Sequence, residues 1–194
     1  MAILAPQVVT QSVADFLKNK ANTSKIRFRI NKIQVSPERF ASASEAIRSG
    51  KIKVEIDPSL SHSGTYNTVK NVLSIKNQNI GLHSALTKAF IIHEAVHMGN
   101  DVDKIGVVRA IDEEAAGFIA QAVYLKVSAG LSLIDRSNKK INAMYMAANE
   151  AADYVIKGSA VELFNFSVND VRSKLKAIGI YKKIISTNIH HNGV

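Results

Sequence analysis

Cysteine and tryptophan are absent from this chain of 194 residues, and aromatic residues are scarce. Without cysteine, the chain forms no disulfide, no thiolate metal site and no cysteine nucleophile. Aromatic residues make up 6% of the sequence and hydrophobic residues 46%, so isoleucine, valine, leucine and alanine must supply most of the core. This balance is ordinary for a globular protein and suits helices packed on a small sheet.

Signals for export and for membrane insertion are also lacking. Residues 1–6 have neither the basic residues nor the long apolar run of a Sec signal peptide. No segment is apolar over the length of a membrane span. We therefore expect a protein without a membrane span that is cytoplasmic when made, and any export would require a specialised secretion system. The sequence does not indicate an oligomeric state.

Acidic residues are in the minority, since the net charge is +9, but they are concentrated in one segment. Residues 85–125 contain six Asp and Glu against three Lys and Arg, whereas the flanking segments are basic. A divalent cation needs local negative charge, so the acidic segment suits a metal site. The basic residues elsewhere are scattered, which favours a role in solubility, with nucleic acid as the alternative partner.

The hydrophobic pattern predicts an α+β fold, with a small N-terminal sheet followed by a predominantly helical body. No linker rich in Pro, Gly or Ser divides the chain, so residues 1–194 should form a single domain. Gly99 and Asn100 favour a left-handed stop and are expected to end the first long helix. Strands are expected over residues 25–30, 51–56 and 71–75, and long helices over residues 82–98, 109–128, 138–157 and 168–177.

The sequence His93-Glu94-Ala95-Val96-His97 falls within the first of these long helices. Residues four apart lie on the same face of a helix, so both imidazoles can reach one ion. Glu94 is rotated by about 100° from His93, and it can instead take a proton from a water on that ion. The helix is otherwise nearly all apolar, and a metal would give both buried imidazoles a partner.

The His-Glu-x-x-His pattern resembles the signature of the zincin metallopeptidases. In addition, Glu113-Glu114 followed by Ala115-Ala116-Gly117 resembles the second ligand helix of their gluzincin branch. The resemblance implies a zincin-like body whose metal-site core covers about residues 64–128. It also implies Zn²⁺ as the cofactor, Glu94 as the catalytic base, and three metal ligands, namely His93, His97 and Glu114.

Two other residues are alternatives for the third ligand. Glu113 is followed by the same small residues and fits the second ligand helix almost as well as Glu114. Asp103 lies six residues after His97, a spacing that resembles zincins in which the third ligand follows a turn at the end of the signature helix. Those zincins have Gly where this chain has Asn100, and Asn tolerates the left-handed conformation that such a turn requires.

The resemblance also implies where a peptide substrate binds. In zincins the substrate lies antiparallel to an edge strand beside the metal, since an edge strand has unpaired backbone groups. The apolar strand just before the signature is formed by Val72, Leu73, Ser74 and Ile75, and it is therefore expected to be that edge. His190 and His191 lie in a C-terminal segment expected to be disordered, and Tyr124 is expected to pack in the core.

The function that these residues predict is a zinc metallopeptidase, a hydrolase that acts on a protein or peptide substrate. The small size of the chain suits either a bacterial effector or toxin or a cytoplasmic regulatory protease. The alternative is a non-catalytic, metal-stabilised binding module with a basic surface. Glu94 favours the enzyme, because a purely structural metal site does not need that carboxylate.

Overall fold

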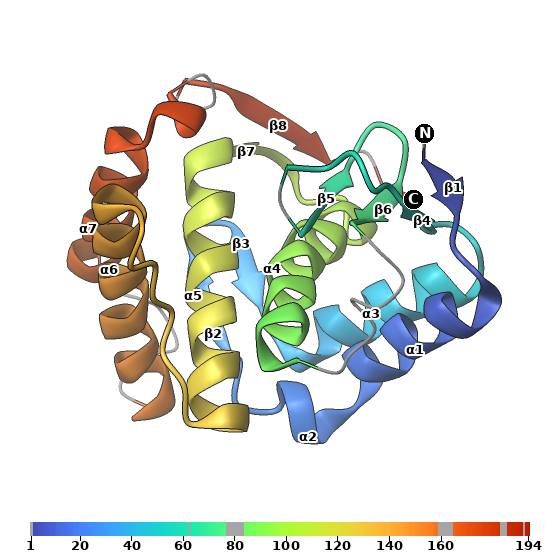
Figure 1. Cartoon of the computed structure of the whole chain (residues 1–194), viewed down its shortest axis with the longest axis horizontal. Helices are drawn as coiled ribbons and strands as arrows, with labels where there is room; N and C mark the ends of the chain where they lie inside the picture. The colour runs from blue at the N-terminus through green and yellow to red at the C-terminus, as the bar shows by residue number, and fades with distance from the viewer. Residues whose placement is uncertain (1, 62, 77–83, 159–164, 183–185, 192) are drawn as a thin grey trace.

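The computed structural model of the chain describes residues 2–61, 63–76, 84–158, 165–182, 186–191 and 193–194, and its fold is α+β. As the sequence predicted, a small sheet in the N-terminal part precedes a mainly helical body. Helices α4 (Ala85–Val102) and α5 (Ala110–Ala129) lie side by side at the centre (Figure 1). Helices α6 (Lys139–Ile156) and α7 (Asn165–Ala177) lie beyond α5.

The N-terminal part builds the other side of the molecule. Helices α1 (Gln7–Lys18) and α3 (Pro37–Arg48) pack on each other, and both contact α4. The short helix α2 (Lys20–Thr23) follows α1. The hairpin of β2 (Phe28–Ile30) and β3 (Ile33–Val35) contacts both central helices through β3. The two central helices are thus covered on both sides, which explains why α5 is buried over most of its length. Among the described helices, none is both long and apolar enough to cross a membrane.

The main sheet has four strands in the order β1, β4, β6, β5. These are β1 (Ile3–Leu4), β4 (Lys53–Ile56), β6 (Val72–Ile75) and β5 (Gly64–Asn67). Strands β4 and β6 are parallel, and β5 is antiparallel to β6. Gly64 allows β5 to lie close to α4, because a Cβ atom there would be 2.9 Å from Cε1 of Phe90.

The prediction that Val72, Leu73, Ser74 and Ile75 form the edge strand is wrong. These residues form β6, which is paired with β4 on one side and with β5 on the other. Val72, Leu73 and Ile75 are all buried, so the strand is covered on both faces, and a continuous apolar run is typical of such an interior strand. In the part of the sheet that the structure describes, the edge beside α4 is β5.

Helix α4 also continues past the predicted stop at Gly99-Asn100 and ends at Val102. Gly99 is used for packing, since a Cβ atom there would lie 3.2 Å from Cβ of Arg39. Asn100 is completely buried, and its side chain accepts a hydrogen bond from Arg39 and donates one to Glu113. Lys104, with φ 52°, adopts the left-handed conformation instead. Tertiary contacts therefore override the local stop signal.

The last strand of the chain is ordered, contrary to the expectation of a disordered segment. Strand β8 (Asn188–His191) pairs antiparallel with β7 (Gly106–Arg109), which leads into α5. Figure 1 shows β8 crossing from the side of α7 towards β5 and β6. His190 is exposed, but His191 is buried. The pairing therefore brings a histidine from near the end of the sequence into a buried position.

An ion pair anchors α7 to α5. Nε of Arg172 donates to Oδ1 of Asp112 at 2.8 Å, and both side chains are buried. Asp112 also accepts hydrogen bonds from Arg109 and Asn31. This carboxylate, which stands next to Glu113 in the sequence, is therefore engaged in holding helices together.

We predict that Arg172→Ala lowers the free energy of unfolding by about 3 kcal/mol, because the buried carboxylate of Asp112 loses an ionic partner. Arg109→Ala is the matched control: its side chain contacts the same carboxylate but is 56% exposed, so the loss should stay below about 1 kcal/mol. Urea unfolding of both variants measures the difference. Equal losses would contradict the structural role given to Arg172.

Candidate metal centre

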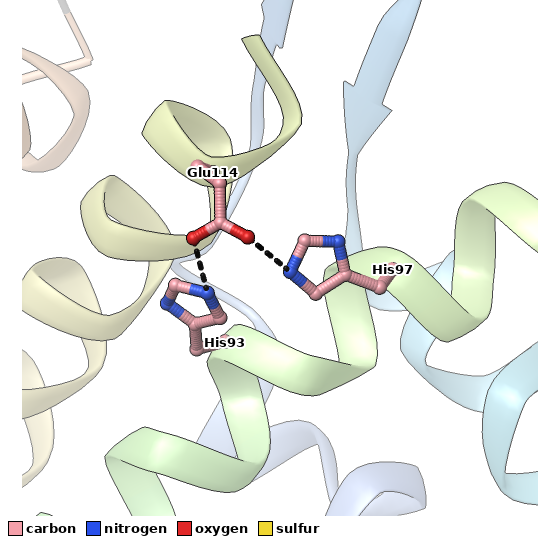
Figure 2. A group of neighbouring side chains, drawn as sticks. All are labelled: His93, His97 and Glu114. Atoms are coloured by element: carbon pink, nitrogen blue, oxygen red, sulfur yellow. Dashed lines mark ion pairs between the residues drawn. The ribbon is translucent and has the colours of Figure 1, made fainter. Parts of the chain in front are cut away.

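The two central helices bring three potential metal ligands together. His93 and His97 lie one turn apart on α4, and Glu114 lies in the first turns of α5. Figure 2 shows the carboxylate of Glu114 between the two imidazoles. One ligand atom from each residue lies within 4.8 Å of the others. The three residues named from the sequence thus form one group, and binding of a metal to them stays a prediction.

The distances within this group suit a small tetrahedral ion. Nε2 of His93 lies 3.5 Å from Oε2 of Glu114, and Nε2 of His97 lies 3.7 Å from Oε1 of Glu114. Ligands bound at about 2.0–2.1 Å to a tetrahedral zinc are about 3.3 Å apart. The two His–Glu separations exceed that value only slightly, but they end on different oxygens of Glu114. The three ligand atoms together lie within 4.8 Å of one another, so the side chains would have to draw closer to complete the coordination.

Small residues after Glu114 allow this approach of α5 to α4. Gly117 faces the imidazole of His93, and a Cβ atom there would lie 2.8 Å from both Cε1 and Nε2. Phe118 packs its ring edge-on against the same imidazole, with the ring centroids 4.5 Å apart. Ala115 and Ala116 are fully buried. His93 is therefore held between a glycine and an aromatic ring.

Glu113 lies behind His97 and outside the group of three. Its Oε2 atom is 3.2 Å from Nδ1 of His97, whereas Nε2 of His97 faces Glu114. In metal sites, a carboxylate on the far nitrogen of a histidine fixes the orientation of the ring. Although burial opposes the change, the positive charges of His97 and His191 lower the pKa of Glu113. The geometry thus gives Glu113 a supporting position beside His97.

Asp103, the other alternative, lies away from the described group of potential ligands. It caps the C-terminus of α4 and forms an ion pair with Nε of Arg39 at 2.7 Å. Because α4 continues through Gly99 and Asn100, the chain makes no early turn that would carry Asp103 back to the histidines. The spacing of six residues after His97 therefore does not produce the expected approach.

Glu94 is buried between α4 and the edge strand β5. Its Oε2 atom accepts a hydrogen bond from the backbone N–H of Tyr66 at 2.8 Å, which uses one of its two carboxylate oxygens. Burial raises the pKa of Glu94, and the charges of His93 and His97 oppose part of that shift. A carboxylate with a raised pKa is a better proton acceptor near neutral pH.

The group carries a surplus of negative charge. Glu94, Glu113 and Glu114 surround two imidazoles. Burial alone would lower the pKa of His97, but the charge of Glu113 and its contact with the ring, followed by the charges of Glu114 and Glu94, raise that pKa to about 10. Such an environment favours a cation, whether a proton or a metal ion.

A second buried cluster, which no local sequence pattern predicts, lies behind His97. Nε2 of His191 lies 2.9 Å from Oε1 of Glu113, and Nδ1 lies 3.6 Å from Oδ1 of Asp101. The hydroxyl of Tyr66 donates to Oδ2 of Asp101 at 2.8 Å. Burial opposes the shift, but Asp101 and Glu113 raise the pKa of His191 to about 9. His191 escaped notice because this contact depends on strand pairing between distant segments.

Tyr181, at the end of the short helix η2 (Gly179–Tyr181), is a further residue near the group. Its ring lies 6.2 Å from that of Phe118, which in turn packs on His93. Burial, followed by the negative charges of Glu114 and Glu94, raises the pKa of Tyr181, so its hydroxyl stays protonated. Tyr124, in contrast, packs edge-on against Phe16 in the core, as predicted.

We predict that Gly117→Ala displaces the imidazole of His93 and weakens zinc binding by about tenfold or more. Overpacking costs about 1–3 kcal/mol, and 1.4 kcal/mol corresponds to a factor of about ten. The matched control is Gly179→Ala, where an added Cβ meets no described atom within 4 Å. Competition with a chromophoric chelator measures both affinities. Unchanged affinity in Gly117→Ala would show that His93 is not positioned by this contact.

The chain was compared with models of protein families, with curated proteins and with solved structures, and none of the three comparisons gave a match. The function proposed for the site therefore rests on the residues and distances of this chain.

Proposed function

We propose that this protein is a zinc-dependent metallopeptidase in which His93, His97 and Glu114 hold the ion and Glu94 is the catalytic base. One observation carries the proposal: two Nε2 atoms from α4 and one carboxylate from α5 converge, with a second buried carboxylate, Glu94, beside them. The sequence resemblance to zincins supports the same assignment of roles.

The donor set favours zinc over other common ions. Two imidazoles and one carboxylate are a known ligand set of catalytic zinc, which keeps a fourth position for water or substrate. Calcium and magnesium prefer sites made of oxygen ligands only. The acidic surplus around the imidazoles also suits a divalent ion. When bound, zinc would polarise the substrate carbonyl and acidify a water molecule.

Residues of the chain would then transfer the protons and stabilise the charge that develops during hydrolysis. Glu94 accepts the proton of the attacking water and returns it to the leaving amine. The N–H of Tyr66 holds one carboxylate oxygen of Glu94, so the other oxygen is the one that takes the proton. Tyr181, whose ring packs on Phe118 beside His93, would supply a hydroxyl donor for the negative charge that develops on the carbonyl oxygen.

The position of β5 supports a peptide as the substrate. This strand forms the edge of the sheet beside α4, and it contacts Glu94 directly. An extended peptide can add to such an edge through its backbone, here through groups other than the N–H of Tyr66, which already donates to Glu94. We therefore assign the role of the substrate-flanking strand to Gly64–Asn67 rather than to β6.

A comparison of ligand variants tests the metal site. Wild-type protein should bind about one zinc per chain, and His93→Ala and Glu114→Ala should lose it, because each removes a ligand atom. Glu113→Ala should retain zinc with weaker affinity, by about 10–100-fold. Asp103→Ala, which removes the acidic residue that caps α4 outside the group, is the control and should bind normally. Metal analysis after dialysis measures the content, and full zinc in Glu114→Ala would overturn the assignment.

We predict that Glu94→Gln keeps zinc and the fold but slows peptide hydrolysis by about 10²–10⁴-fold, because the amide keeps the shape of the side chain and loses the proton acceptor. Glu45→Gln, on the exposed face of α3, makes the same chemical change away from the site and should not alter the rate. Mass spectrometry of a digested peptide library measures turnover. Loss of zinc in Glu94→Gln would make Glu94 a ligand, and wild-type zinc protein that cleaves no peptide would refute the peptidase function.

A further inference from the structure

We propose that His191 is a positioning residue for the metal site: it holds the carboxylate of Glu113, which in turn orients His97. Strand β8 is then a part of the site, although it contributes no ligand. This inference rests on the metal site proposed above and goes beyond it, because it assigns a function to a residue remote in sequence from both ligand helices.

Ion-pair contacts form a continuous path from β8 to the ligand, although Oε2 of Glu113 and both ring nitrogens of His191 make no hydrogen bond to a described residue. Nε2 of His191 lies 2.9 Å from Oε1 of Glu113, and Oε2 of Glu113 lies 3.2 Å from Nδ1 of His97. The two oxygens of one carboxylate thus contact two different imidazoles. Asn100 donates to the oxygen that faces His191, at 2.7 Å. Glu113 is completely buried, so protein groups rather than bulk water must hold it in place.

The path continues on the other side of His191. Nδ1 of this residue lies 3.6 Å from Oδ1 of Asp101, whose other oxygen accepts the hydroxyl of Tyr66. The backbone N–H of the same tyrosine donates to Glu94. The proposed base and the proposed ligand His97 are therefore joined through one chain of buried contacts, and His191 lies at its centre.

Electrostatics explains why a histidine is required at this position. Asp101 and Glu113 are both buried and acidic, and the imidazole of His191 lies between them. A buried carboxylate that loses its ionic partner becomes an unpaired buried charge, which is strongly unfavourable in the folded state. Without His191, the side chain of Glu113 would have to move, and His97 would lose the contact at Nδ1. A residue that only packs β8 against the body would have no effect on His97.

The test compares His191→Gln with His190→Gln, its exposed neighbour on the same strand. His191→Gln should weaken zinc binding by about 10–100-fold, as removal of groups that support metal ligands does, and His190→Gln should not. The affinity is measured by competition with a chelator. The visible spectrum of the Co²⁺-substituted protein reports the ligand geometry and should change only in His191→Gln. Circular dichroism checks that both variants are folded.

A double-mutant cycle separates positioning from a general loss of stability. In a Glu113→Gln background, His191→Gln should cause little further loss of zinc affinity, because the path to His97 is already broken. Full and additive losses would overturn the proposal. If His191→Gln does not fold, Tyr66→Phe replaces it: this change removes one hydroxyl at Asp101 and should weaken zinc binding severalfold, and unchanged affinity would overturn the proposal.

The outcomes distinguish this inference from the proposed function. Wild-type protein that binds zinc but cleaves no peptide would refute the peptidase and leave the role of His191 intact. Wild-type affinity and cobalt spectrum in a folded His191→Gln variant would refute the role of His191 alone. Wild-type protein that binds no zinc would overturn both.

Discussion

The close contact between α4 and α5 is the constraint on which the rest of the structure depends. At Gly117 the two helices approach so closely that a single Cβ atom would collide with the imidazole of His93. This approach places Glu114 opposite both histidines, and the outer helices serve to cover the pair on either side. A looser contact with larger side chains would separate the three potential ligands.

The same contact concentrates ionisable side chains in the interior, which lowers the stability of the folded state. His93, Glu94, His97, Asp101, Glu113 and His191 are all buried, and ionisable groups are rarely buried without partners. Here two of the buried acidic side chains contact basic ones. Asp101 of α4 contacts His191 of β8, and Glu113 of α5 contacts both His191 and His97. The hydroxyl of Tyr66 on β5 donates to Asp101. A protein selected only for stability would be expected to fill this space with hydrophobic residues. The conflict between local stability and polar content is typical of a functional site.

The sequence was sufficient where the deciding information is local. Helical periodicity predicts that His93 and His97 share one face of a helix, and the small residues after Glu114 predict a close approach of the second helix. The hydrophobic pattern predicts the α+β order of elements. It was insufficient where the answer depends on a distant partner. Whether Val72–Ile75 is an edge or an interior strand is decided by β4 and β5, and whether Asn100 ends a helix is decided by Arg39 and Glu113. The burial of His191 depends on β7, which no local pattern reveals.

The pairing of β7 with β8 has a consequence for the order of folding. Gly106 lies opposite His191, and α5, α6 and α7 all intervene between the two strands. Contacts between such distant segments carry a large loop-closure entropy and tend to form late. The two central helices can therefore associate before β8 docks, so that an immature chain would hold His93, His97 and Glu114 without the support behind them. Full metal affinity would then be a property that the chain acquires at the last step of its maturation.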